Sequence, residues 1–170
     1  MLASFDDAGA VIVSQPTTIR FDPADSRRRY TPDFSVKWSD GRFELVEVKY
    51  RADLRADWPK LRPGFIAARD VARAAGGRFR IATERSIRGP RLDNARRLLP
   101  LRRAPLDRTL AETAKAIVAT MDAPTLRDTV TAMPCDRVAA LGAIWRLMAR
   151  GDLLFDAQRA VGFDTRLRLS

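Results

Sequence analysis

The sequence predicts a compact α/β protein that continues into a mainly helical carboxyl-terminal part. Short stretches of alternating apolar and polar residues fill the first fifty residues, and turn-forming residues separate them. An alanine-rich helical stretch and one more strand follow, which gives the order strand, strand, strand, helix, strand, helix of a compact α/β plan. The composition then shifts near residue 101 toward three helical segments and two short extended ones.

The first half of the chain begins with extended segments. We expect these over residues 11–13, 17–21, 30–38 and 42–50. A turn is expected over 22–26, and Ser39-Asp40-Gly41 joins the last two segments as a hairpin.

Helical signals follow residue 57. Trp58-Pro59 is expected to open the helical region and Pro63 to restart it, and Gly76-Gly77 ends it. A short strand over 79–83 and a helix that includes Asn94–Leu99 complete this half.

The second half reads as three helices and a hairpin. Helices are expected over 106–121, from Pro124 onward, and over 136–150, where Gly151 ends the last one. Strand-like pieces follow over 153–156 and 165–169, and three helices followed by a β-hairpin is the plan of a winged helix. We therefore predict two domains, residues 1–103 and 104–170.

Charge is the most informative feature of the composition. The 170 residues include 31 Lys and Arg against 21 Asp and Glu, a net charge of +10, which favours a polyanionic partner such as nucleic acid. A genome rich in arginine codons is the alternative explanation. Residues 1–100 hold 20 basic and 13 acidic residues, and residues 101–170 hold 11 and 8, so we expect the anionic partner to meet the first part.

The residue content of the chain excludes several classes of protein function. The chain has no histidine, which removes Ser-His-Asp and Cys-His catalysis, and the single Cys135 removes an internal disulfide and a cysteine-based zinc site. No apolar run reaches the roughly 20 residues that span a bilayer. The start of the chain, with Asp6 and Asp7, does not resemble a signal peptide. We expect a soluble intracellular protein.

The hairpin loop predicts which residues face each other. A three-residue loop pairs Trp38 with Arg42, and Gly41 occupies the last loop position, where a left-handed residue is needed. The same register pairs Asp33 with Glu47. Since directly opposed residues share a face, we expect the two carboxylates about 5 Å apart.

These carboxylates suggest hydrolytic chemistry. Glu47 and Lys49 share one face of the strand, and we expect that face to be polar because Val46 and Val48 occupy the core face. Two close carboxylates suit Mg²⁺ or Mn²⁺, which would polarise a phosphodiester and activate water. Lys49 would orient that water or offset charge on the phosphate. The alternative is an ordinary Glu-x-Lys ion pair on an exposed strand.

Basic residues flank this pair of strands. On charge grounds we expect them to grip phosphates of DNA, the alternative for the triplet being a solvated turn. They are Arg27, Arg28, Arg29, Arg51 and Arg55.

The segments Tyr30-Thr31-Pro32-Asp33-Phe34 and Leu45-Val46-Glu47-Val48-Lys49 resemble the PD-(D/E)xK nuclease signature. More narrowly, residues 10–100 resemble the TnsA-type endonuclease subunit of heteromeric bacterial transposases. The further features that carry this resemblance are Gln15-Pro16, Arg29-Tyr30, Ile81–Glu84, Ile87-Arg88, Asn94 and Leu98-Leu99.

The resemblance implies a restriction-endonuclease-like mixed sheet flanked by helices over residues 1–103, with the winged-helix-like region after it. It implies Asp33 and Glu47 as metal ligands, the carbonyl of Val48 as a further ligand, and Lys49 as the catalytic lysine. The implied cofactor is Mg²⁺, with Mn²⁺ as a substitute. If these side chains lay on opposite sheet faces, or in an apolar layer, the nuclease assignment would fail.

The implied task is cutting the 5′ ends of a transposon. The implied partners are the transposon DNA, an integrase-type transposase that cuts the 3′ ends, and an AAA+ ATPase regulator, in the bacterial cytoplasm at the nucleoid. One departure stands out: the family has a glutamate in a helix before the first strand, and here only Asp6 and Asp7 precede Val11. We expect that helix to be missing; the alternatives are that an aspartate substitutes or that fewer metals bind. The rival functions are a restriction or repair nuclease of the same fold and a DNA-binding or assembly subunit without catalysis.

Overall fold

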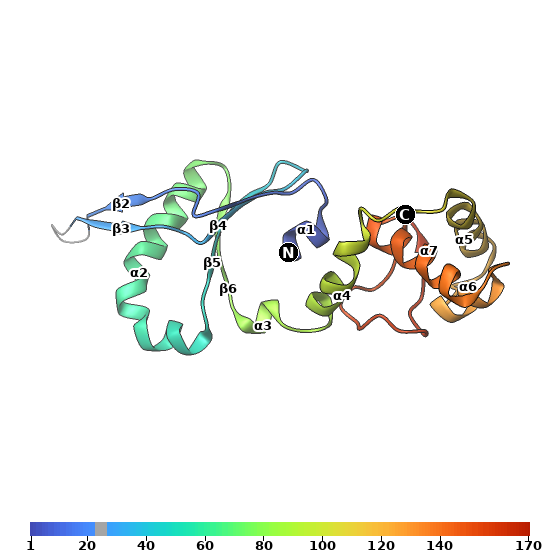
Figure 1. Ribbon diagram of the computed structural model, residues 1–170. Coiled ribbons are helices and arrows are strands. Elements are labelled where there is room, and N and C mark those ends of the chain that lie inside the picture. The colour runs from blue at the N-terminus through green and yellow to red at the C-terminus, as the bar shows by residue number, and fades with distance from the viewer. Residues whose placement is uncertain (23–26) are drawn as a thin grey trace. The chain divides into compact units, whose positions relative to one another are not determined.

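The computed structural model describes residues 1–22 and 27–170, so the expected turn at 22–26 lies almost wholly outside the described residues. The chain divides into two compact units, Met1–Arg88 and Gly89–Ser170 (Figure 1). The elements of the first unit are α1 Leu2–Asp6, β1 Val11–Ser14, β2 Ile19–Phe21, β3 Arg28–Tyr30, β4 Phe34–Lys37, β5 Phe43–Val48, α2 Arg51–Ala74, β6 Arg78–Ala82 and α3 Glu84–Ile87.

A four-stranded mixed sheet forms the centre of the first unit, in the order β1-β4-β5-β6. Strands β1, β4 and β5 pair antiparallel, and α2 crosses over to bring β6 parallel to β5. Strands β2 and β3 form a separate two-stranded ribbon. The unit is therefore of the expected mixed α/β class.

The hairpin of β4 and β5 has the predicted register. Phe34 pairs with Val46, and the Trp38 N–H donates to the Arg42 carbonyl at 2.8 Å. Gly41 has φ +87°, the left-handed conformation that the last position of this loop requires. The expected long strand is interrupted, however: residues 28–30 pair with β2, and β4 begins only at Phe34.

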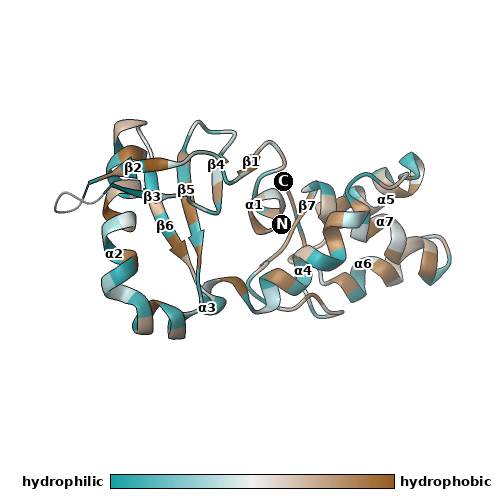
Figure 2. Cartoon of the chain, turned by 60° about the vertical axis from the view of Figure 1, so that its left-hand side comes forward, coloured by the Kyte–Doolittle hydropathy of each residue, from teal (hydrophilic) through white to brown (hydrophobic). Residues whose placement is uncertain are grey.

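Helix α2 differs from the expectation, because it begins at Arg51 rather than at Trp58 and runs through Pro59 and Pro63. Each proline removes a backbone N–H from the helical ladder. Packing against the sheet compensates, since buried α2 residues join apolar residues of β2 and β5. This first core cluster consists of Ile19, Leu45, Ala68 and Ala72. Figure 2 shows hydrophilic and hydrophobic residues interleaved along α2, as a helix with one buried face requires.

The opposite face of the sheet is also covered. Its buried residues are Val36, Val46 and Ala82, with residues of α1, β1 and α3 packed against them. The expected division of β5 into an apolar face with Val48 and a polar face with Glu47 is therefore wrong. Val48 is 40% exposed and Glu47 only 4%. A central strand covered on both sides buries both sets of side chains.

The second unit contains four α-helices and a 3₁₀ helix, with a short strand pair after the last helix. Its elements are α4 Pro90–Leu98, the 3₁₀ helix η1 Leu99–Leu101, α5 Arg108–Thr120, α6 Leu126–Ala132, α7 Arg137–Arg150, β7 Leu153–Leu154 and β8 Arg168–Leu169. Strands β7 and β8 pair antiparallel, and Thr125, between α5 and α6, forms a bridge with Arg166. Gly151 ends α7 with φ +86°, as the sequence indicates.

The boundary between the units falls after Arg88 rather than after residue 103. Helix α4 belongs to the second unit because the buried Asn94 ties it there. The Asn94 side-chain amide donates to the carbonyls of Ala157 and Arg159 at 3.1 and 2.7 Å, and its oxygen accepts from the Val161 N–H. No helix in the described part of the chain is long and apolar enough to cross a membrane.

Candidate functional site

Asp33 lies where the chain passes from β3 to β4. Buried Pro32 precedes it and favours an extended conformation before the turn into the sheet. The Gln15 N–H donates to the Asp33 carbonyl at 2.8 Å, and the Val48 N–H donates to Asp33 Oδ2 at 2.7 Å. Backbone and side chain of Asp33 are thus both fixed, with the carboxylate at the carboxyl end of β5.

Glu47 is a buried carboxylate with two polar partners. The Tyr30 hydroxyl donates to Glu47 Oε2 at 2.6 Å, and the Lys49 ammonium lies 3.3 Å from Oε1. A buried charge is costly without such partners. Glu47 is therefore buried on the same side of β5 as the core residue Leu45, but its carboxylate has two polar partners.

Lys49 directly follows β5 and continues its extended conformation. Its N–H donates to the Ala82 carbonyl at 3.0 Å, so the extended pairing with β6 persists and the side chain points to the same side as Glu47. The Lys49 side chain is 35% exposed, against 5% for Glu47. The structure thus gathers the three residues singled out by the sequence at one end of β5, with the lysine toward solvent.

Tyr30 is the residue of this site that the sequence did not single out for function. Burial, and then the hydrogen bond and charge of Glu47 and the charge of Asp33, raise the pKa of Tyr30 well above its ordinary value. The phenol therefore stays protonated and remains a donor at neutral pH. Its place in the Tyr30–Phe34 motif was visible, but its contact with Glu47 depends on the tertiary packing of β3, which lies outside the four-stranded sheet.

The oxygen atoms at this site suit a hard divalent cation. Asp33 Oδ1 accepts no hydrogen bond from any residue the structure describes, and Asp33 Oδ2 is bound to the N–H of Val48, the residue that follows Glu47. Among the described residues no group of three or more His, Cys, Asp or Glu side chains gathers anywhere. Mg²⁺ is commonly held by one or two carboxylates with water filling the other positions, so this donor set fits.

Asp7, one of the two early aspartates, has another role. It accepts hydrogen bonds from the N–H groups of Gly9 and Ser39 at 2.8 and 2.7 Å. These bonds hold the pKa of Asp7 below its ordinary value. Ser39 lies in the hairpin loop, at the other end of β4 and β5 from Asp33 and Glu47. Asp7 therefore does not substitute for a ligand.

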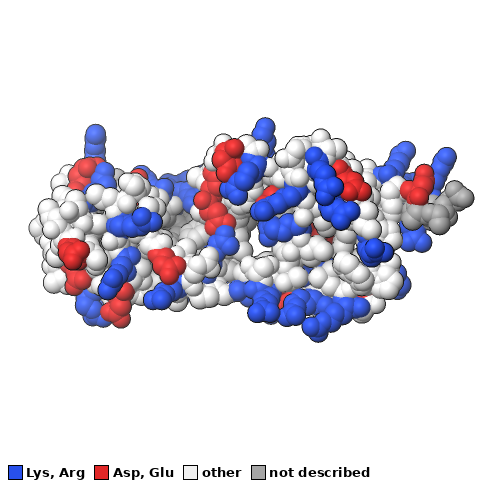
Figure 3. Space-filling view, turned by 180° about the vertical axis from the view of Figure 1, so that it is seen from behind, with Lys and Arg blue, Asp and Glu red and all other residues white. Residues whose placement is uncertain are grey.

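The expected DNA-contacting arginines are all exposed. Arg28 and Arg29 lie in β3, opposite Phe21 and Arg20, so the triplet enters a strand rather than a turn. Arg51 and Arg55 lie in the first two turns of α2, directly after Lys49. Figure 3 shows a row of Lys and Arg side chains along the edge formed by α3 and the start of α2. The Glu84 carboxylate joins these two elements by accepting from the Arg51 N–H at 3.1 Å.

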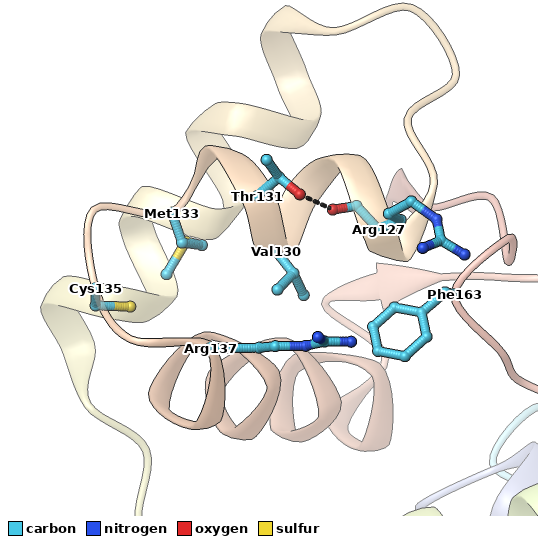
Figure 4. Close-up of a pocket in the computed structure, with 7 residues that line it drawn as sticks. All are labelled: Arg127, Val130, Thr131, Met133, Cys135, Arg137 and Phe163. Atoms are coloured by element: carbon cyan, nitrogen blue, oxygen red, sulfur yellow. Dashed lines mark hydrogen bonds between the residues drawn. The ribbon is translucent and has the colours of Figure 1, made fainter.

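A second basic feature lies in the second unit. Arg127 of α6 and Arg137 of α7 lie over the ring of Phe163, 5.3 and 4.7 Å from its centroid (Figure 4). They border a pocket of about 330 Å³ that Val130, Met133 and other residues also line. The residues that line this pocket all belong to the second unit, whereas Asp33, Glu47 and Lys49 belong to the first.

Two carboxylates and a lysine at the end of a central strand, on a mixed α/β sheet, are consistent with a nuclease of the PD-(D/E)xK class. Residues 10–84 match the family described as TnsA-like endonuclease N terminal. This match confirms, for these residues, the resemblance to TnsA-like endonucleases seen in the sequence. The match covers β1 to β6 and the whole site. No curated protein matches the chain.

Proposed function

We propose that this protein is a metal-dependent DNA endonuclease that hydrolyses phosphodiester bonds as a subunit of a heteromeric transposase. The family match supports the endonuclease class. The observation that carries the proposal is the meeting of Asp33, Glu47 and Lys49 at the end of β5, where Asp33 Oδ2 binds the Val48 N–H at 2.7 Å and Lys49 lies 3.3 Å from Glu47.

Each residue of the site has a chemical role in this proposal. Asp33 and Glu47 hold Mg²⁺ or Mn²⁺, with the Val48 carbonyl as a further ligand. The bound ion would polarise the phosphodiester and lower the pKa of a coordinated water. Lys49, partly exposed beside Glu47, orients the attacking water and stabilises the charge that develops on the phosphate.

The basic residues around the site bind the DNA backbone. Arg27, Arg28 and Arg29 lead along the chain into Tyr30 and Asp33, and Arg51 and Arg55 follow Lys49 in the sequence. Because both basic segments connect directly to the site, a duplex held by their guanidinium groups would pass the carboxylates. The exposed positions of all five residues support this role.

The finer assignments follow the family. We propose that the first unit has the restriction-endonuclease-like fold and cuts the 5′ ends of a transposon. Its partners would be an integrase-type transposase and an AAA+ ATPase regulator. We also propose that the second unit is winged-helix-like. Its order of helix, bridge, two helices and a strand pair supports that assignment.

One observation favours a second candidate function, a DNA-binding or assembly subunit without catalysis. The described part of the chain offers two carboxylates at the site and no third, and Asp7 is engaged at the hairpin loop. A nuclease that needs a third acidic ligand would be inactive with this donor set. Its basic surface would still bind DNA.

Cleavage of supercoiled plasmid in Mn²⁺, alone and with the transposase partners, tests the proposal. We expect Asp33→Ala and Lys49→Ala each to lower the cleavage rate at least 100-fold and to leave DNA affinity within about twofold, because they remove transition-state interactions. Asp40→Ala is the matched control, since Asp40 is an exposed carboxylate in the same hairpin that pairs with Arg42.

The outcomes of the cleavage experiment distinguish the candidate functions. Cleavage that survives Asp33→Ala would show that the site has been misplaced. Equal DNA binding by wild type and variants, with no cleavage in any mixture, would favour the binding subunit. Sequence-specific cleavage without any partner would favour a restriction or repair nuclease of the same fold.

A further inference from the structure

The hydroxyl of Tyr30 has one polar partner among the residues the structure describes, and that partner is Glu47. The distance from Tyr30 Oη to Glu47 Oε2 is 2.6 Å, at the short end of the range for a hydroxyl donating to a charged oxygen. The Lys49 ammonium lies against the other oxygen, Oε1, at 3.3 Å. The two contacts together fix the rotation of the carboxylate about its last side-chain bond.

The Tyr30 ring is itself held by an aromatic cluster. It meets Phe65 and Phe79 edge to face, with ring centroids 5.8 and 6.3 Å away. Phe65 belongs to α2 and Phe79 to β6, so two elements fix one ring. The hydroxyl therefore reaches Glu47 from a direction that the packing sets.

Gly64 of α2 also lies against the Tyr30 ring. A Cβ atom added at Gly64 would lie 3.0 Å from Tyr30 Cδ2 and 3.1 Å from Cγ, closer than ordinary packing allows. The buried Gly64 thus allows the helix backbone to approach the ring. A larger residue there would push Tyr30 away from its place.

We propose that Tyr30 is a positioning residue that orients the Glu47 carboxylate for a divalent metal ion, and that α2 sets this orientation through Gly64 and Phe65. The inference rests on the proposed function of the site. Packing alone does not explain the hydroxyl, since phenylalanine would fill the same aromatic cluster and leave no polar atom to satisfy. Partners of this kind around a metal ligand commonly change metal affinity 10- to 100-fold when they are removed.

The test is titration of the full chain with Mn²⁺ by calorimetry, with no DNA present. We expect Tyr30→Phe, which removes only the hydroxyl, to weaken Mn²⁺ binding about tenfold. Val36→Ala is the matched control: it removes buried packing in the core cluster on the opposite face of the sheet, so we expect it to lower the midpoint of thermal unfolding and to leave Mn²⁺ affinity within about twofold. Gly64→Ala is a second variant that keeps the hydroxyl and displaces the ring, and we expect it to weaken Mn²⁺ binding as well.

Asp33→Asn separates this inference from the proposed metal site. If Asp33→Asn abolishes Mn²⁺ binding and Tyr30→Phe binds Mn²⁺ as tightly as the wild type, or more tightly, the positioning role of Tyr30 is wrong and the metal site stands. If Asp33→Asn also binds as the wild type does, the metal site itself is wrong, and the role of Tyr30 with it. A loss in Val36→Ala equal to that in Tyr30→Phe would assign the effect to a general loss of packing and overturn the inference.

Discussion

At the scale of single residues, β5 carries two buried glutamates with different partners. Glu44 is 2% exposed and pairs with Arg78 and Arg80 of β6, with the Arg80 Nε 3.1 Å from its Oε2. Glu47 lies on the other side of the strand and pairs with Tyr30 and Lys49. Two arginines neutralise the carboxylate of Glu44 within the sheet, whereas Glu47 shares its strand end with Asp33. Both glutamates are buried, so it is their positions and partners that distinguish Glu44, which has a structural role, from Glu47, the candidate metal ligand.

Asp7 gives a prediction at this scale. Its pKa is lowered in the folded protein, so its contribution to stability is present above the unfolded pKa near 3.8 and is lost as pH falls through the folded pKa. We expect Asp7→Ala to lower the midpoint of thermal unfolding by a few degrees at pH 7. The difference from wild type should be smaller at pH 2 than at pH 7, because the carboxylate loses its charge as the pH falls below 3.8 and through the folded pKa. Asp122→Ala, at an exposed aspartate of the second unit, is the comparison. A difference that is the same at both pH values would contradict the role of the Asp7 carboxylate.

At the scale of elements, the return from α2 to β6 sets the parallel pairing that completes the site. Gly77 lies in this connection, and its N–H donates to the Ala72 carbonyl at 2.8 Å. The β5 backbone passes beside it, so that a Cβ atom at Gly77 would meet the carbonyl oxygen of Phe43 in a steric clash. The sequence pair Gly76-Gly77 therefore ends the helix and also permits close approach of two strands.

Gly77→Ala tests this approach. We expect it to lower the free energy of unfolding by about 1–3 kcal/mol, because the Phe43 backbone cannot move away without disturbing the β5–β6 pairing. Denaturant unfolding followed by circular dichroism measures the change. The control is Ala75→Ser, an exposed neighbour that we expect to alter stability by less than about 0.5 kcal/mol. A neutral Gly77→Ala would show that the strand connection tolerates displacement.

At the scale of the whole molecule, the charge and the division into two units bear on the proposed binding of DNA. The net charge is +10, and the arginines placed next to the site all belong to the first unit. Phosphate contacts of this kind release counterions, so the affinity depends strongly on salt. The second unit has exposed basic residues of its own, such as Arg168, which lies outside the matched range of the sequence, residues 10–84.

The salt dependence of the DNA affinity tests which unit makes the phosphate contacts. We expect the affinity of the full chain for a 30-base-pair duplex to fall at least about tenfold between 50 and 200 mM salt, measured by fluorescence anisotropy. The double substitution Arg28→Gln with Arg29→Gln should reduce the slope of log affinity against log salt by about 1–2. Arg168→Gln, from the second unit, should leave that slope unchanged. Equal effects of the two variants would contradict a DNA site confined to the first unit.

The sequence by itself determined the features that depend on near neighbours. The three-residue loop with Gly41 set the register that opposes Asp33 and Glu47, and Gly151 marked the end of α7. The charge pattern indicated an anionic partner, and the motif around Asp33 indicated the family. Turn geometry and side-chain periodicity act over a few residues, so one strand or turn contains the information.

Tertiary structure decided what depends on segments far apart in the chain. It buried Glu47 by covering both faces of β5, kept α2 helical through Pro59 and Pro63, and placed the Tyr30 hydroxyl on Glu47. It also assigned α4 to the second unit through Asn94. Periodicity tells which residues share a face but not which element covers it, because that choice depends on contacts between segments that the local sequence does not encode.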